Sequence, residues 1–178
     1  MSSIIDPFLV DQYKEAMRSF PASVSVIATG DKEHRTGLTA TAVCSLSAEP
    51  PQIIVCLNAK TGTFNSIKES RYFSVNVLQA EQEALAKCFG GFDPNISGEQ
   101  RFSKGCWHQG LLGVPILKGA ILTFECSLVE ALPAQTHFIL VGAVKQIHKS
   151  AQAPMAATLL YADGAFGQLS PLAHEALL

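Results

Sequence analysis

Short runs in which apolar and polar residues alternate follow one another along most of this chain. The runs at residues 23–29, 37–47 and 137–147 have the two-residue period of half-buried β-strands. Shorter apolar runs at 52–57 and 72–78 fit buried strands. Strand-like and helical segments do not alternate regularly, so the pattern predicts a mainly β barrel rather than a parallel sheet with crossover helices.

A few peripheral helices are expected around the strands. Apolar residues recur at helical spacing before Pro21, which should end the first helix: Phe8, Tyr13, Ala16, Met17 and Phe20. A brief helix is predicted around Phe64 and Ile67, and another over residues 81–89. The stretch at 90–95 then contains two glycines and a proline, so a long loop is expected to begin there.

The second half of the chain predicts further strands. Residues 120–129 read as a strand that shares one apolar face: Ala120, Leu122, Phe124, Cys126 and Leu128. Pro133 is expected in the connector to the run at 137–147, and residues 159–169 offer one more strand. The chain shows no repeat or linker, so residues 1–178 should form a single domain, with 1–12 and 170–178 as peripheral tails.

Charge and composition exclude several classes of function. The formal net charge is −2 and both signs are mixed along the chain, so there is no basic stripe for nucleic acid. The first residues lack a basic, apolar leader, and no later run reaches the ~18 apolar residues of a membrane span. The sequence therefore predicts a soluble, cytoplasmic protein.

The cysteines and histidines do not form a recognisable metal or disulfide pattern. The cysteines are odd in number and include no CxxC pair: Cys44, Cys56, Cys88, Cys106 and Cys126. The histidines are scattered and none is paired with a cysteine. We expect no metal site, and we interpret the cysteines as buried thiols in a reducing compartment.

The run at 37–47 has two contrasting faces if it is one strand. Apolar or small residues point one way, and the hydroxyls of Thr39, Thr41, Ser45 and Ser47 point the other. Small neighbours such as Ala40 and Ala42 would let a flat heteroaromatic ring come close to the hydroxyl wall. The alternative is a half-solvated strand whose outer face carries threonine because β-branched residues favour strands.

The segment from Leu57 to Phe64 follows a buried strand and leads into a short helix. Asn58, Lys60, Thr61 and Thr63 lie in it, and a helix N-terminus with a cation and hydroxyls suits a phosphate. An ordinary loop with a threonine cap is the alternative.

His137 opens the second long strand, where an imidazole could bond to a cofactor or be purely structural. No Ser-His-Asp or Cys-His arrangement is recognisable, and Glu125 and Glu130 do not form an acid–base pair.

Ordered motifs over most of the chain resemble the flavin reductase-like family, the short reductase components of two-component flavin monooxygenases. Residues 24–29 resemble its "GVxVVT" strand, and 37–51 resemble "GxTAxxxxSxSxxPP". Residues 73–78 resemble "FxVNxL", and 85–91 resemble "LAxxFxG". The family commonly has Gly-Asp-His before its late strand, and this chain has Gln135-Thr136-His137.

The resemblance implies a fold and a set of site residues. The fold is an FMN-binding split β-barrel of Greek-key type. Thr39, Ala40, Thr41 and Ala42 would meet the flavin ring, with Ser45 in the same motif. The phosphate would lie at Leu57, Asn58, Lys60, Thr61 and Thr63. Phe89 and Gly90 would flank the ring, His137 would place the nicotinamide, and Tyr161 belongs to a closing motif that borders the site in some members.

The activity implied is that of an NAD(P)H:flavin oxidoreductase. Hydride would pass from NADH or NADPH to FMN or FAD, and a homodimer would supply reduced flavin to a separate monooxygenase. Two alternatives stay open on the sequence alone. The electrons could pass to a corrinoid or another metal centre, or the chain could be a non-catalytic flavin- or haem-binding module.

Overall fold

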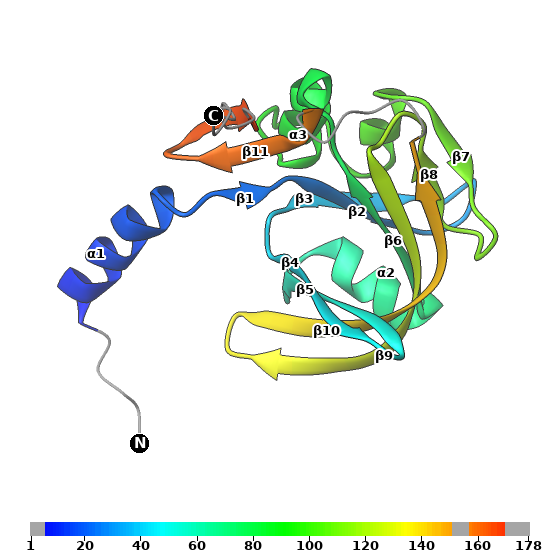
Figure 1. Cartoon of the computed structure of the whole chain (residues 1–178), viewed down its shortest axis with the longest axis horizontal. Helices are drawn as coiled ribbons and strands as arrows, with labels where there is room; N and C mark the ends of the chain where they lie inside the picture. Colours follow the sequence, from blue (N-terminus) through cyan, green and yellow to red (C-terminus); the bar gives the residue numbers. More distant parts are fainter. Residues whose placement is uncertain (1–5, 151–156, 170–178) are drawn as a thin grey trace, which may run out of the picture.

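A seven-stranded antiparallel sheet forms the body of the computed structural model, which describes residues 6–150 and 157–169 (Figure 1). The strands lie in the order β3-β2-β6-β9-β10-β5-β4. Their bounds are β2 Ser25–Thr29, β3 Thr36–Ala40, β4 Val43–Ala48, β5 Pro51–Asn58, β6 Tyr72–Val77, β9 Leu122–Ala134 and β10 His137–Lys149. The mainly β fold expected from the alternating runs is confirmed.

The connection between β3 and β4 forces this sheet to roll up. The two strands lie at opposite edges of the hydrogen-bonded order, yet only Thr41 and Ala42 separate them in the chain. A flat sheet would hold its outer strands about 29 Å apart, from six spacings of about 4.8 Å. Three residue steps span at most about 11 Å. The edges must therefore approach each other, although β3 and β4 share no ladder.

Helices and two small sheets surround the barrel. The helices are α1 Pro7–Arg18, α2 Gly62–Ser70, η1 Ala80–Gln82, α3 Glu83–Phe89 and η2 Gly98–Ser103. One small sheet contains β1 Ala22–Ser23, β11 Leu159–Ala162 and β12 Ala165–Gln168, and the other contains β7 Trp107–Gln109 and β8 Pro115–Leu117. Among the described residues no helix is both long and apolar enough to cross a membrane.

Two apolar cores lie on opposite faces of β2. Ile27 belongs to the core that also contains Phe73 and, from α2, Phe64. Val26 belongs to the other core, which contains Phe89 of α3. Strand β2 is therefore buried along its whole length, and α2 and α3 are held on fixed sides of it.

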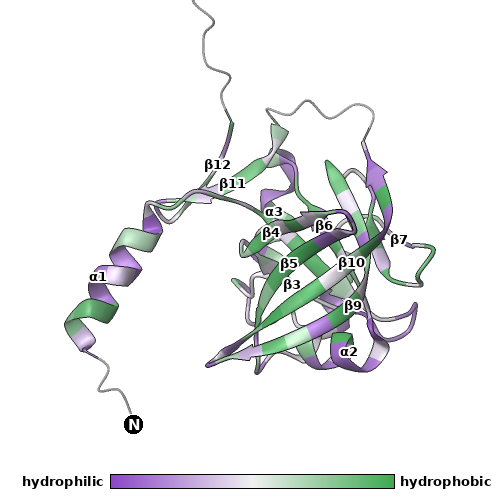
Figure 2. Ribbon diagram, turned by 60° about the horizontal axis from the view of Figure 1, so that its bottom comes forward, coloured by the Kyte–Doolittle hydropathy of each residue, from purple (hydrophilic) through white to green (hydrophobic). Residues whose placement is uncertain are grey.

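The first helix stands apart from the barrel (Figures 1 and 2). Asp6 caps α1 through a hydrogen bond from the Phe8 amide, and the helix ends at Arg18, before Pro21. No residue of α1 is buried, and the side chains of Phe8 and Tyr13 are exposed. The amphipathic pattern thus predicted the helix correctly, but its apolar side chains do not pack on the barrel.

Four expectations about local structure were wrong. Residues 159–169 form a hairpin of β11 and β12 rather than one strand. The run at 37–47 is not one strand, because the chain leaves the sheet at Thr41 and Ala42 and rejoins it at the opposite edge. Pro133 lies inside β9, opposite Phe138, and the turn to β10 consists of Gln135 and Thr136.

The fourth correction concerns the thiols. Cys44 and Cys106 are exposed, and Cys56 is half-buried. Only Cys88 and Cys126 are buried as expected. Burial disfavours the charged thiolate and raises the pKa of Cys126 to about 12.

A substitution at Gly142 of β10 would test how tightly the barrel is packed. A Cβ atom at this position would lie 2.6 Å from Phe73 Cζ, so Gly142→Ala should lower the free energy of unfolding by about 1–3 kcal/mol. Gly167→Ala is the control, because no atom of the described residues lies within 4 Å of its added Cβ. Urea unfolding measures both. Equal stability of the two variants would show that Phe73 has room to move.

Candidate functional site

A cavity of about 450 Å³ lies at the split between the two edges of the sheet. Five parts of the chain meet there: β3 with the turn after it, the end of β5 with the loop into α2, the end of α3, η2 and the start of β10. The lining residues are Leu38, Thr39, Ala40, Thr41, Ala42, Cys56, Leu57, Asn58, Thr61, Phe89, Gly90, Arg101 and His137.

The edge of β3 presents backbone groups to this cavity. The Gly37 carbonyl accepts a hydrogen bond from Arg101 Nη1 at 3.2 Å, so it points away from β2. Backbone groups in a strand alternate in direction, so the N–H and C=O of Thr39 also point away from β2. Among the described residues, no strand pairs with that side of β3. The Thr39 backbone therefore offers one donor and one acceptor at the split.

The Thr39 side chain does not form the wall expected from a continuous strand. Its hydroxyl donates to the Ala86 carbonyl at 2.7 Å and fixes β3 to α3. Thr41 and Ala42 are exposed in the turn between β3 and β4. The surface along this motif is thus made by small side chains and the free edge of the backbone.

The loop from β5 into α2 forms a second wall. Thr61 caps α2, accepting from the Phe64 amide at 3.3 Å and donating to the Asn58 carbonyl at 2.9 Å. The Lys60 amide donates to Asn58 Oδ1 at 2.9 Å. The amides of Gly62 and Thr63 find no hydrogen-bond partner in the described part of the chain. Free N–H groups at the start of a helix attract an anion.

His137 stands beside this loop at the start of β10. It lies opposite Asn58 in the β10–β5 ladder, and its Nδ1 is 2.8 Å from the Thr136 hydroxyl. The side chain is exposed at the mouth of the cavity. It is therefore placed to contact a ligand that enters from solvent.

Most of the residues singled out in the sequence meet at this cavity. The lining contains Thr39, Ala40, Thr41, Ala42, Leu57, Asn58, Thr61, Phe89, Gly90 and His137. They come from segments up to about a hundred positions apart, and only the rolled sheet brings them together.

Four other candidates do not line the cavity. Ser45 lies in β4 on a separate hollow with Cys44 and Ile53. Tyr161 lies in β11, with its ring 5.1 Å from that of Phe166.

Lys60 and Thr63 lie just outside the lining. Lys60 is exposed beside the cavity. Thr63 is buried, and its hydroxyl lies 3.0 Å from that of Thr36. The Thr63 side chain is therefore part of the packing, whereas its backbone amide remains free.

Three lining residues were not predicted from the sequence: Leu38, Cys56 and Arg101. Arg101 comes from η2, at the end of a long loop, where no periodicity marks the direction of a side chain. Its Nη1 bonds to the carbonyls of Gly37 and Phe89, at 3.2 and 3.4 Å. Cys56 was interpreted only as part of a buried strand, but it lies near the end of β5, at the split.

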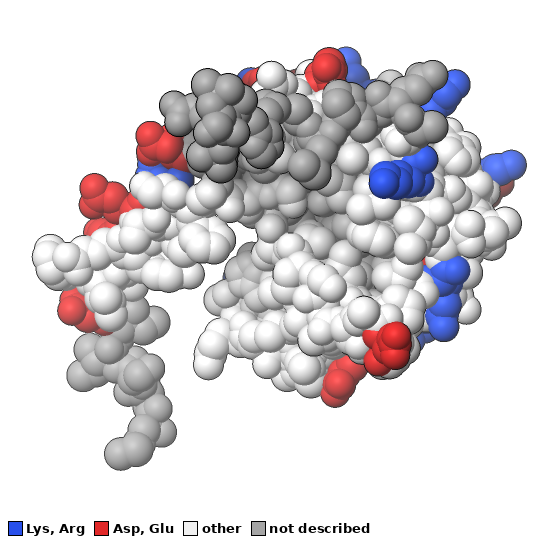
Figure 3. Space-filling model, in the orientation of Figure 1, with Lys and Arg blue, Asp and Glu red and all other residues white. Residues whose placement is uncertain are grey.

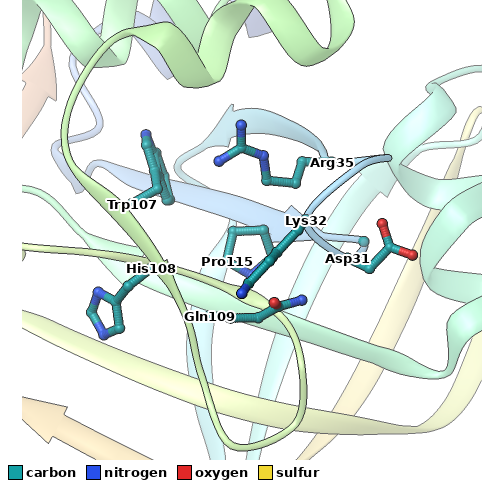
Figure 4. A pocket seen from close by; sticks show the side chains of 8 residues that line it. Asp31, Lys32, Arg35, Trp107, His108, Gln109 and Pro115 are labelled. Carbon is teal, nitrogen blue, oxygen red and sulfur yellow. The ribbon is translucent and has the colours of Figure 1, made fainter.

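A second hollow, of about 310 Å³, lies between the β2–β3 turn and β7 (Figure 4). Its Arg35 is already paired with Glu99, and Asp31 accepts hydrogen bonds from the amides of Glu33 and His34. These bonds lower the pKa of Asp31. The polar groups of this hollow are largely engaged, and it contains none of the predicted site residues, so the cavity at the split is the better candidate.

No group of three His, Cys, Asp or Glu that could hold a metal ion is found in residues 6–150 and 157–169. The chemistry of the cavity is that of hydrogen-bond donors, small side chains and one guanidinium. Such a lining suits a planar ligand with a polar edge and an anionic group.

Comparison with known proteins gives a consistent result. Residues 17–170 match the model of the flavin reductase like domain. The FMN reductase (NADH) RutF of Escherichia coli K12 is 38% identical over 143 residues, which cover 79% of this chain and 85% of RutF.

Two solved structures are similar in fold. The NADH:FAD oxidoreductase SgcE6 of Streptomyces globisporus, in complex with NAD and FAD fragments, superposes with a TM-score of 0.83 at 25% identity, covering 97% of this chain and 99% of SgcE6. BorF, the flavin reductase component of a bacterial two-component tryptophan halogenase, superposes with a TM-score of 0.80 at 27% identity, covering 92% of this chain and 99% of BorF.

Two of the three threonines that line the cavity, Thr61 and Thr41, should differ in their effect on stability. Thr61→Ala removes a helix cap and should lower the free energy of unfolding by about 1 kcal/mol. Thr41→Ala removes an exposed hydroxyl and should change it by less than about 0.5 kcal/mol. Urea unfolding of both variants measures the difference. A Thr61 variant as stable as the Thr41 variant would mean that the cap contributes nothing.

Proposed function

This chain belongs to the flavin reductase-like family, and from that premise we propose that it transfers hydride from NADH or NADPH to a flavin. The observation that carries the proposal is the cavity at the split. It combines a free strand edge, small side chains and a helix N-terminus in one place. FMN needs each of these, because it joins a planar, polar-edged ring to a phosphate.

The flavin ring is proposed to lie along residues 39–42. The backbone N–H and C=O of Thr39 supply hydrogen bonds to the polar edge of the ring, and Ala40 and Ala42 are small enough to let it approach. Phe89 and Gly90 border the ring from the side of α3. Ser45 and Tyr161 have no place in this arrangement within one chain.

The phosphate is proposed to lie at the N-terminus of α2. The free amides of Gly62 and Thr63 donate to it, and Asn58 and Thr61 shape the loop. Lys60 is exposed beside this loop and adds positive charge from solvent. The role of Thr63 is therefore taken by its amide rather than its buried hydroxyl.

The bound flavin supplies the redox chemistry, as the acceptor of the hydride. The protein aligns the two reactants and keeps the ring in a shaped, partly enclosed cavity. His137, exposed at the mouth, is proposed to place the nicotinamide. Because the flavin and the nicotinamide carry out the chemistry, the site needs no carboxylate for acid–base catalysis, and the described lining residues include none.

Reduced flavin is proposed to serve a separate monooxygenase. BorF is described as the reductase component of a two-component halogenase, and its likeness to this chain supports such a partner. FMN is the preferred flavin in this proposal, because RutF is an FMN reductase. The proposed place of action is the cytoplasm, where NADH is available.

We also propose that the chain acts as a homodimer. The helix α1 projects from the barrel with Phe8, Leu9, Tyr13 and Met17 exposed, an apolar surface of the kind that marks a protein interface. On the face shown in Figure 3, the sides of α1 and of the barrel that face each other carry few charged side chains.

Sedimentation equilibrium should give twice the mass of one chain. Replacing Tyr13 and Met17 together with Asp should shift the mass towards that of the monomer, because two carboxylates would have to be buried at the interface. A wild-type monomer at micromolar concentration would refute the dimer.

The function is tested by anaerobic stopped-flow reduction. Mixing the protein and FMN with NADH should bleach the flavin absorbance, with one NADH oxidised per flavin. His137→Ala should leave FMN affinity unchanged and slow the bleaching by about tenfold for each 1.36 kcal/mol of lost transition-state stabilisation. Dithionite, which needs no nicotinamide site, should reduce both proteins equally.

Two results would contradict this account. If FMN binds but NADH and NADPH do not bleach it, the chain is a flavin-binding module and not a reductase. If the variant keeps the wild-type limiting rate and NADH affinity, His137 has a structural role only.

A further inference from the structure

We propose that Arg101 makes the site selective for reduced flavin, because its guanidinium stabilises the negative charge that the ring gains on reduction. The inference rests on the proposed function and extends it to the retention and release of the product. It assigns a role to a residue that no sequence motif marked as part of the site.

The position of Arg101 is fixed from two sides. Its Nη1 bonds to the Gly37 carbonyl on the free edge of β3 and to the Phe89 carbonyl at the end of α3. Its Nε is buried and has no hydrogen-bond partner in the described part of the chain. The guanidinium is thus held between β3 and α3 before any ligand binds, and little conformational entropy is lost on binding.

Part of the guanidinium remains available to a ligand. Nη2 donates no hydrogen bond to the described residues, and Arg101 lines the cavity together with Thr39, Phe89 and Gly90. Thr39 is two residues from Gly37 on the same strand edge, a rise of about 7 Å. The cation therefore lies close to the backbone groups that are proposed to meet the ring.

The charge of Arg101 is not neutralised within the cavity. Among the described lining residues it is the only Lys or Arg, and no Asp or Glu is present. Arg35, in the neighbouring hollow, is instead paired with Glu99. A cation without a carboxylate partner in a partly enclosed cavity favours an anionic ligand.

Hydride transfer creates such an anion. The C4–H bond of the nicotinamide breaks with its electron pair, a bond to flavin N5 forms, and NADH becomes NAD⁺. The neutral oxidised ring thereby gains one negative charge, which spreads over its pyrimidine edge. The phosphate of FMN is charged in both redox states, and the amides of α2, on the other wall, are proposed to bind it. Arg101 is therefore proposed to interact with the negative charge that the ring gains on reduction, and not with the phosphate, whose charge is the same in both redox states.

The test compares the affinity of the protein for oxidised and reduced flavin. Oxidised FMN is titrated by fluorescence in air, and dithionite-reduced FMN is titrated under anaerobic conditions. The wild-type protein should bind reduced FMN more tightly. Arg101→Gln keeps donors but removes the charge, and should reduce this preference at least about tenfold, which lowers the two-electron potential of bound FMN by about 30 mV. Riboflavin should show the same loss.

Two variants serve as controls. Lys104→Gln removes a nearby exposed cation that does not line the cavity, and should keep the wild-type preference. Arg101→Lys retains the charge and should keep most of the wild-type preference for reduced FMN. Thermal unfolding establishes that each variant is folded. If Arg101→Gln does not fold, the Lys variant decides, because loss of preference in a folded Arg101→Lys protein would overturn the proposal.

Three other outcomes would overturn the proposal, because each would give Arg101 a different role. Equal weakening of oxidised and reduced FMN, with riboflavin spared, would place the guanidinium on the phosphate. A raised KM for NADH or NADPH, with unchanged flavin affinities, would place it on the dinucleotide. An unchanged affinity ratio in a folded variant would make it structural. A wild-type protein that binds no flavin would instead refute the proposed function.

Discussion

The two-residue connection between β3 and β4 is the constraint on which the rest of the structure depends. It joins the two outermost strands of a seven-stranded sheet, so the sheet must roll until its edges approach. The edges come close without pairing, and the backbone N–H and C=O of Thr39 stay free on the edge of β3. Free edge groups are normally a liability for a β protein. Here they lie in the cavity with the end of β5, the start of α2 and the end of α3, and a flat polar ligand would satisfy them.

The packing around this split fixes the position of the site. Strand β2 has an apolar core on each face, which fixes α2 on one side and α3 on the other. The Thr39 hydroxyl and Arg101 then attach β3 to the end of α3. The donors of the site are thus positioned by the barrel rather than by the ligand, as efficient hydride transfer between two bound rings requires.

The sequence predicted the class of fold and most of the cavity, and the failures have physical causes. Alternation located β2 and β10, and short apolar runs located β5 and β6. Alternation did not reveal the break between β3 and β4 at Thr41 and Ala42. The chain keeps its alternating pattern there while it crosses from one sheet edge to the other and changes direction. The motif resemblance named Thr39 and Phe89 together, but Arg101 follows a loop without periodicity, so only the folded chain places it at the site.

Amide hydrogen exchange of Thr39, measured by NMR, shows whether the free edge of β3 binds the flavin ring. Without ligand this N–H should exchange faster than that of Leu38, which faces β2. Riboflavin and FMN should both slow it, because both contain the ring, whereas only FMN should slow the amides of Gly62 and Thr63. If saturating FMN leaves the exchange of Thr39 unchanged, the ring does not lie on this edge, and the proposed site is wrong.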